Sequence, residues 1–362
     1  MKSFLVVLIS LCVLGNAVAA AQLPHLLNAQ PVERSARAGL QPVLHELTTS
    51  TGKAVWVGYS VPAIPGEHHM CCFSNGYRSH QDDSCCGSCR LDGHAGSLTT
   101  NKQENCQSTL SNTFYVFLQF DKGQVEHARM FSPNCTIDAQ GVTLFWLSDV
   151  LSSQSVEYLT SLVAGRDGSD RGHDVADEIL AAIALHADPS ADKALENFVQ
   201  PGQPTKVRNQ AAFWIGNTRG ARGLDVLLPL IKADQDHDFL EQAIFAISQN
   251  SEKDRAFREL VQFARQDPRF NVREEALFWL AQEAGRKAAG VITESIENDP
   301  ETDVKKKAVF ALSELPSSEG VPLLIDQARK NPNPVVRKEA VFWLGQSDDQ
   351  RAVEFIASIL EK

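Results

Sequence analysis

The second half of this 362-residue chain repeats at a spacing of about 32 residues. Five copies share an alanine that is followed two positions later by a phenylalanine, and successive alanines are 32, 33, 32 and 32 residues apart. A degenerate sixth copy begins at Val175, with Ile179 in the alanine position. The shared alanines are Ala211, Ala243, Ala276, Ala308 and Ala340. A repeat of this length indicates a row of small supersecondary units.

Each copy has the residue spacing of an amphipathic helix. Val207, Ala211 and Ile215 are four residues apart and fall on one helix face. A second amphipathic stretch follows in each repeat, and turn residues such as Asp267-Pro268 separate the units. One helical pair of this kind cannot bury its apolar face alone, whereas stacked pairs can. The pattern therefore predicts a curved α-solenoid of about six helical hairpins.

A turn that contains proline, followed by Val-Arg and then by alanine three residues after the arginine, marks the repeats. One copy reads Asp267-Pro268 and then Val272-Arg273-Glu274-Glu275-Ala276. This resembles the HEAT-repeat family, in particular its short bacterial subtype and the PBS-lyase HEAT-like repeats, over residues 156–362. The resemblance implies a solenoid whose extended concave surface binds other proteins, and it leaves the partner undefined.

The aromatic residues of the repeats form a second regular series. Each shared alanine is followed by Phe213, Phe245, Phe278, Phe310 or Phe342, and the next residue alternates between tryptophan and alanine. We predict that these phenylalanines belong to the repeat core with the alanines, in interdigitated layers. The alternative is an aromatic ladder that lines the groove of the solenoid. The recurrent basic residues Arg208, Arg273, Lys305 and Arg337 are expected to make hydrogen bonds between repeats.

The first 20 residues have the three parts of a secretory signal. Lys2 gives a positive start, residues 4–14 are almost wholly apolar, and Ala17-Val18-Ala19 fits signal peptidase. The apolar run is shorter than the roughly 20 residues that span a bilayer, and no other window is long and apolar enough to span. We therefore expect an exported protein, periplasmic or secreted, with no membrane span and with a mature N-terminus at Ala20 or Ala21.

Seven of the eight cysteines lie between positions 71 and 135, and none follows in the rest of the chain. This change in composition predicts a separate Cys-rich domain over residues 22–150. In an oxidising compartment, clustered cysteines are first interpreted as disulfides. The candidates are Cys71, Cys72, Cys85, Cys86, Cys89, Cys106 and Cys135, and we expect at least two bonds among them.

The same cluster contains metal-ligand residue types, because His68 and His69 precede Cys71 and Cys72, and His94 follows Cys89. Its spacing differs from that of zinc knuckles. A metal site formed by His68, His69, Cys71, Cys72, Cys85, Cys86 and Cys89 is therefore the alternative to disulfides. A redox pair at Cys86 and Cys89, which form a C-x-x-C motif, is a further alternative.

The remainder of this domain favours a mainly antiparallel β structure. Residues 54–61 alternate as in a strand, and residues 142–147 form another short apolar run. Residues 114–120 and 124–131 are rich in β-formers and are joined by Asp121-Lys122-Gly123, which predicts a hairpin. Residues 42–47 fit a short helix with Pro42 in its first turn.

Charge and motifs restrict the function. The formal net charge of −11 argues against nucleic acid and anionic lipid as partners. Deoxyhypusine hydroxylase, an enzyme with HEAT-like repeats, binds iron through His-Glu pairs, whereas the corresponding positions here are Asn209-Gln210, Glu274-Glu275 and Lys338-Glu339. Phycobilin lyases also carry such repeats, but an exported protein has no evident bilin substrate. We therefore expect a non-enzymatic protein-interaction module or scaffold without a cofactor, and a metal-binding or redox protein centred on His68–His94 as the alternative.

Overall fold

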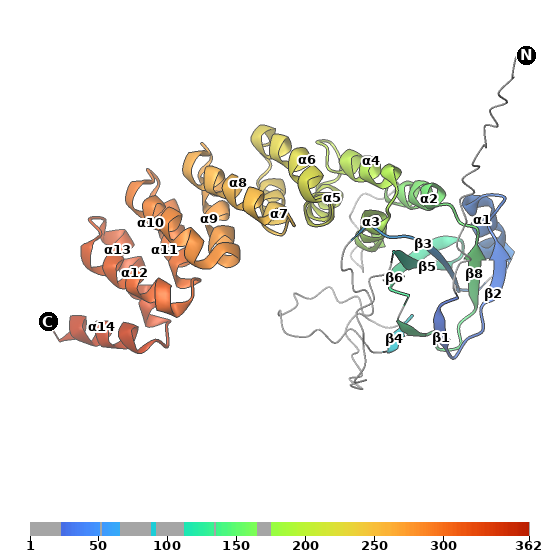
Figure 1. The fold of residues 1–362 in the computed structure, drawn as a ribbon, viewed down its shortest axis with the longest axis horizontal. Coiled ribbons are helices and arrows are strands. Elements are labelled where there is room, and N and C mark those ends of the chain that lie inside the picture. The colour runs from blue at the N-terminus through green and yellow to red at the C-terminus, as the bar shows by residue number, and fades with distance from the viewer. Residues whose placement is uncertain are drawn as a thin grey trace, which may run out of the picture. The chain divides into compact units, whose positions relative to one another are not determined.

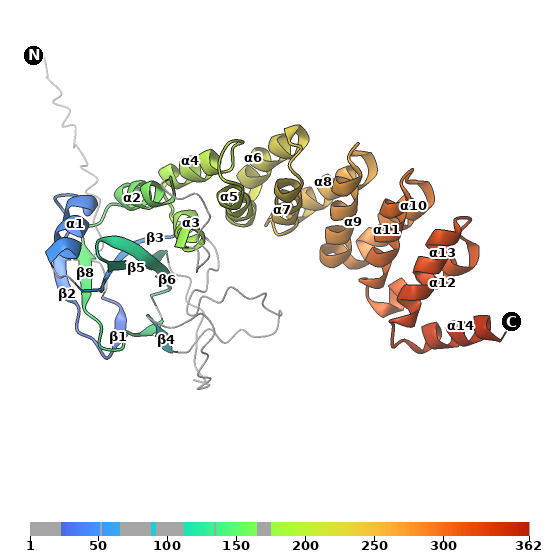
Figure 2. The ribbon, with the colours of Figure 1, turned by 180° about the vertical axis from the view of Figure 1, so that it is seen from behind.

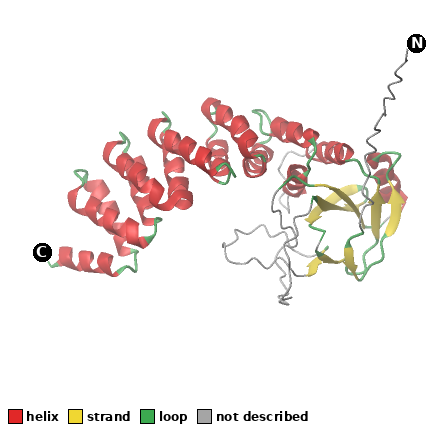
Figure 3. Ribbon diagram, viewed as in Figure 1, coloured by secondary structure: helices red, strands yellow, loops and turns green. Residues whose placement is uncertain are grey.

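The computed structural model describes residues 23–50, 53–65, 88–91, 112–133, 135–164 and 175–361. The chain divides into two compact units. One consists of residues 1–61 and 67–154, and the other of residues 62–66 and 155–362. The strands belong to the first unit and most of the helices to the second (Figure 3).

The first unit contains two sheets and one helix. A three-stranded sheet has the order β1-β7-β4, and a five-stranded sheet has the order β2-β8-β3-β5-β6. Helix α1 (Leu40–Ser50) confirms the predicted short helix. The strands are β1 (His25–Leu27), β2 (Val32–Ser35), β3 (Val55–Pro62), β4 (Ser88–Arg90), β5 (Thr113–Asp121), β6 (Gln124–Phe131), β7 (Thr136–Asp138) and β8 (Leu144–Ser148).

The prediction of a mainly antiparallel sheet is wrong. Strand β7 pairs in parallel with β1 and β4, and β8 pairs in parallel with β2 and β3. The β5–β6 hairpin is antiparallel as predicted, and its two-residue turn has positive φ at Lys122 (50°) and Gly123 (78°). A hairpin can be predicted from sequence because its two strands follow each other directly along the chain. The parallel pairs join strands from the two ends of the unit, and no local pattern reports their direction.

The core of this unit is aromatic. Trp56, Tyr115, Phe117 and Trp146 are each at most 1% exposed and lie in one cluster. The Tyr115 and Trp146 rings meet edge to face at 5.2 Å. Strand β3 is buried on both faces, which fits its near-continuous apolar run and its place inside the sheet.

The second unit is an array of helical pairs. In both ribbon views its helices form a curved row, with α5, α7 and α9 along the inner side and α6, α8 and α10 along the outer side (Figures 1 and 2). The helices are α2 (Ser152–Ala164), α3 (Val175–Leu185), α4 (Pro189–Phe198), α5 (Thr205–Thr218), α6 (Gly220–Ala233), α7 (His237–Ser248), α8 (Lys253–Gln266), α9 (Phe270–Ala284), α10 (Ala289–Asn298), α11 (Thr302–Ser313), α12 (Ser317–Lys330), α13 (Pro334–Gly345) and α14 (Gln350–Leu360). Among the described helices, none is both long and apolar enough to cross a bilayer.

The shared alanines are fully buried in the packed helices of the repeats. All five are 0% exposed, which confirms their place in the core. They lie on α5, α7, α9, α11 and α13, which pack directly on one another along the row. Small residues permit this approach: a Cβ added to Gly216 of α5 would lie 2.5 Å from the carbonyl oxygen of Ala246 on α7.

The recurrent basic residues connect neighbouring repeats, as expected from the sequence. Arg273, 7% exposed, donates from Nε and Nη2 to the carboxylate of Asp299 at 2.7 and 3.0 Å. Its Nη1 donates to the Asp267 carbonyl oxygen at the end of α8, at 2.9 Å. Arg208 pairs in the same way with Asp234, and Arg337 donates to the Asn331 carbonyl oxygen at 2.8 Å. Each arginine therefore satisfies a helix C-terminus that would otherwise lack donors.

Candidate functional site

The phenylalanines of the repeats lie at partly exposed positions of α5, α7, α9, α11 and α13 and not among the fully buried core residues. Phe213, Phe245, Phe278 and Phe310 are half-buried, and Phe342 is 53% exposed. The prediction that they belong to the repeat core is therefore wrong. An α-helix turns by about 100° per residue, so a side chain two positions after a buried alanine points to the opposite face. The spacing separates the phenylalanines from the alanine stripe in the sequence, but it does not report which of the two faces packs on the neighbouring repeats.

The aromatic rings form one continuous series across five helices. The Phe213 and Phe245 rings stack at 5.7 Å, and the Phe278 and Phe310 rings stack at 6.0 Å. Phe245 contacts Trp279 at 4.5 Å, and Phe310 contacts Trp343 at 4.7 Å. We call this series the aromatic ladder; it comprises Phe213, Trp214, Phe245, Phe278, Trp279, Phe310, Phe342 and Trp343.

Carboxylates are fixed beside two of the indole rings. The Trp279 Nε1–H donates to Glu275 Oε1 at 2.7 Å, and the Trp343 Nε1–H donates to Glu339 Oε1 at 2.9 Å. In both pairs the glutamate precedes the tryptophan by four residues, which places the two side chains on one helix face. The ladder thus presents apolar ring faces with acidic groups held at their edges.

A recess of about 250 Å³ opens beside the ladder between α7 and α9, and the side chains of Glu241, Glu274, Glu275, His237 and Lys307 are among those that line it. Burial raises the pKa of both Glu274 and Glu275 above the ordinary value for glutamate. The Lys307 Nζ lies 5.1 Å from the Phe278 ring and 5.4 Å from the Phe310 ring. Three carboxylates around one lysine leave the recess acidic.

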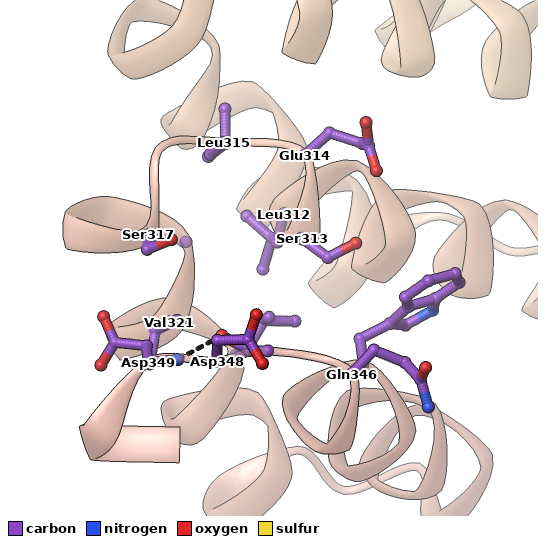
Figure 4. Close-up of a pocket in the computed structure, with 13 residues that line it drawn as sticks. Leu312, Ser313, Glu314, Leu315, Ser317, Val321, Gln346, Asp348 and Asp349 are labelled. Carbon is purple, nitrogen blue, oxygen red and sulfur yellow. Dashed lines mark hydrogen bonds between the residues drawn. The ribbon is translucent and has the colours of Figure 1, made fainter. Parts of the chain in front are cut away.

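A second hollow of about 540 Å³ lies among the last two repeats. Figure 4 shows Leu312 and Val321 at its apolar side, with Glu314 and Asp348 at its margin. The backbone N–H of Asp349 donates to the Ser347 hydroxyl at 3.2 Å and orders the loop before α14. Trp343 also lines this hollow, which therefore continues the surface of the aromatic ladder towards the C-terminal end.

Most of the predicted cysteine and histidine site lies outside the described residues, namely His68, His69, Cys71, Cys72, Cys85, Cys86 and Cys106. The backbone of Cys89 belongs to β4, and its side chain is not described. Cys135 is 1% exposed and disulfide-bonded. The expectation of at least two disulfides stays a prediction, as does the metal site. The described residues contain no group of three or more His, Cys, Asp or Glu side chains that could hold a metal ion.

Stacked helical pairs with an aromatic inner surface define this part of the chain as an α-solenoid built from repeats. The family model for HEAT repeats matches residues 291–362, which contain α11 to α14, and the same helical pairing extends upstream to α3. The second unit is thus a helical-repeat array whose C-terminal part matches the family model for HEAT repeats.

Several solved structures are similar to this array. Human deoxyhypusine hydroxylase in complex with glycerol is 18% identical, with a TM-score of 0.29, covering 58% of this chain and 80% of that chain. The Escherichia coli protein YibA is 21% identical, with a TM-score of 0.35, covering 54% and 71%. The Kap95:Nup1 complex is 14% identical, with a TM-score of 0.29, covering 57% and 29%. A comparison with curated proteins finds no match.

Proposed function

We propose that this protein is an exported, non-enzymatic protein-interaction scaffold, and that the aromatic ladder is its binding surface. The observation that carries the proposal is one unbroken series of eight aromatic side chains along α5, α7, α9, α11 and α13, seven of them half-buried and Phe342 exposed. Soluble proteins seldom expose contiguous apolar surface unless it meets a partner. Tyrosine, tryptophan and arginine supply most of the binding energy at protein interfaces, and three tryptophans lie here.

The curvature of the row also supports the aromatic ladder as the binding surface. The first three helices that carry the ladder, α5, α7 and α9, lie on the inner side of the curve (Figure 2). Repeat solenoids use such concave surfaces to hold extended partners. Stability does not require the rings to be exposed, because the buried alanine stripe already packs these helices together. The exposed rings are therefore best explained by binding.

Site-directed photo-crosslinking in the native cells tests the proposal. A photoreactive phenylalanine analogue replaces Phe310 or Phe342 on the ladder, and Gln262, which is exposed on α8, serves as the matched control. We expect discrete crosslinked proteins from the two ladder positions and none from Gln262. Absence of crosslinks at both ladder positions, or equal crosslinking at Gln262, would reject the ladder as the binding surface.

Export has a separate test. The charged start, apolar run and Ala17-Val18-Ala19 site support removal of the first residues by signal peptidase. N-terminal sequencing of the native protein is expected to begin at Ala20 or Ala21. A protein that still began at Met1 would overturn export and, with it, the argument from an oxidising compartment.

A further inference from the structure

The chemistry of the ladder restricts the partner that it can bind. On α9, the Glu274 carboxylate is half-buried and makes no hydrogen bond or ion pair within the part of the chain that the structure describes. Its neighbour Glu275 accepts one hydrogen bond, from the indole of Trp279. Lys307 attracts the Glu274 carboxylate, but burial outweighs that attraction and raises the pKa of the carboxyl, so a further positive charge would be favourable at this position.

The aromatic groups around these carboxylates favour the same guest. Trp279 contacts the rings of Phe245 and Phe278, so aromatic surface flanks the carboxylates of α9. Cations are attracted to such ring faces, and arginine also stacks on them. Lys307 already uses this attraction from within the chain, since it lies over Phe278 and Phe310.

The glutamate–tryptophan pair occurs again two repeats further on. Glu339 and Trp343 on α13 reproduce the pair of α9, whereas α11 between them carries Ala311 in place of tryptophan and Lys307 in place of glutamate. Packed helices are about 8–10 Å apart, so the two acidic pairs are separated by roughly 16–20 Å. An extended peptide advances about 3.3 Å per residue and covers that separation in about five or six residues.

We propose that the aromatic ladder binds an extended polypeptide segment with two arginine or lysine side chains about six residues apart, an even spacing that directs both to one side of the chain, one at Glu274, Glu275 and Trp279 and the other at Glu339 and Trp343. Lys307 lines the same recess as Glu274 and Glu275, where three carboxylates outnumber it, and α11 carries Lys307 and Ala311 in place of the acidic pair and so offers no third site. This inference rests on the proposed function and names the partner of the same surface.

Fluorescence anisotropy with the mature full-length protein tests the inference. The probe is a labelled, otherwise neutral synthetic peptide with two arginines at the stated spacing. The controls are the same peptide with citrulline in place of arginine, which removes the charge and keeps the shape, and a peptide with adjacent arginines. We expect the spaced peptide to bind at least roughly tenfold more tightly than either control, the factor that 1.4 kcal/mol corresponds to. Equal binding of the citrulline peptide would overturn the inference.

A matched pair of variants tests where on the protein the peptide binds. Glu275→Gln keeps the side-chain volume and an oxygen that can accept from Trp279, and it removes one charge from the proposed site. Glu354→Gln removes one charge from the exposed face of α14, away from the ladder. We expect the first change to weaken the spaced peptide about tenfold and the second to leave it unchanged, with equal melting temperatures. Equal losses in both variants would show that only net charge matters and would refute the site.

Failure of this inference is separable from failure of the scaffold proposal. If photo-crosslinking at Phe310 succeeds while the spaced arginine peptide does not bind, the partner is a protein of different chemistry. If neither experiment succeeds, the ladder is not a binding surface at all.

Discussion

The buried pair of Arg273 and Asp299 is the sharpest test of how the repeats are held together. We expect Arg273→Met to remove the charge and the hydrogen bonds while keeping most of the apolar volume of the side chain. The change leaves Asp299 buried with a backbone N–H, that of Glu301 at 2.9 Å, as its remaining partner. It also leaves the Asp267 carbonyl oxygen without its arginine donor.

The expected loss of stability follows from the burial of both partners of the ion pair. The Arg273 and Asp299 side chains are 8% and 5% exposed, and two hydrogen bonds of 2.7 and 3.0 Å join them. Removing one partner of a buried ion pair typically costs about 3–5 kcal/mol, because the other charge stays buried. Since Asp299 keeps one backbone donor, we expect the lower end of that range, about 3 kcal/mol.

The matched control is a solvent-exposed ion pair that also joins neighbouring repeats. Arg265 of α8 pairs with Glu294 of α10 at 2.6 Å, and these side chains are 44% and 46% exposed. Exposed pairs contribute about 0–1 kcal/mol, so Arg265→Met should cost no more than that. Urea denaturation followed by circular dichroism measures both free energies of unfolding. Equal costs for the two variants would refute the reasoning that burial, and not charge pairing as such, makes the arginine positions important.

Three further predictions concern packing, pH and the ladder. Gly320→Ala should lower the free energy of unfolding by about 1–3 kcal/mol because the new Cβ would lie 2.2 Å from the Leu312 carbonyl oxygen. Gly290→Ala has open space and should raise the free energy of unfolding by up to about 1 kcal/mol. Thermal denaturation of both variants measures the two effects. Burial lowers the pKa of His186 to about 4, below its usual value near 6.5. The unfolded chain therefore binds the extra proton between those values, and up to about 3 kcal/mol of stability should be lost as pH falls from about 6.5 to 4. His186→Gln should remove that portion of the pH dependence, and urea titrations at pH 7 and pH 4.5 measure it; an unchanged pH dependence would contradict the assignment. Phe278→Ala should destabilise less than Leu277→Ala, which is fully buried and should cost about 2–5 kcal/mol; the reverse order in melting temperatures would return the phenylalanines to the core.

The first unit shows where sequence reasoning ends. The hairpin at residues 113–131 was predictable because its two strands are adjacent and Gly123 permits the turn. The parallel pairing of Val32 with Phe145, across more than a hundred residues, leaves no local signal. Both β3 and β8 are buried on both faces, so the alternation that would indicate the direction of a half-exposed strand is absent.

The sequence by itself determined the helical array, because a 32-residue period with alanine every repeat admits few folds other than stacked hairpins. It also determined that Arg208 and Arg273 connect repeats, since their spacing from the helix ends recurs. The tertiary structure decided which side of each helix meets solvent. A phenylalanine next to an apolar stripe looks the same in sequence whether it belongs to a core or to a binding surface. Helices α5, α7, α9, α11 and α13 pack on one another through their alanines, and this packing leaves the phenylalanines outside the core. The same stacking aligns carboxylates from separate repeats beside the rings, because residues 64 positions apart are brought to within about 20 Å only when the solenoid has formed.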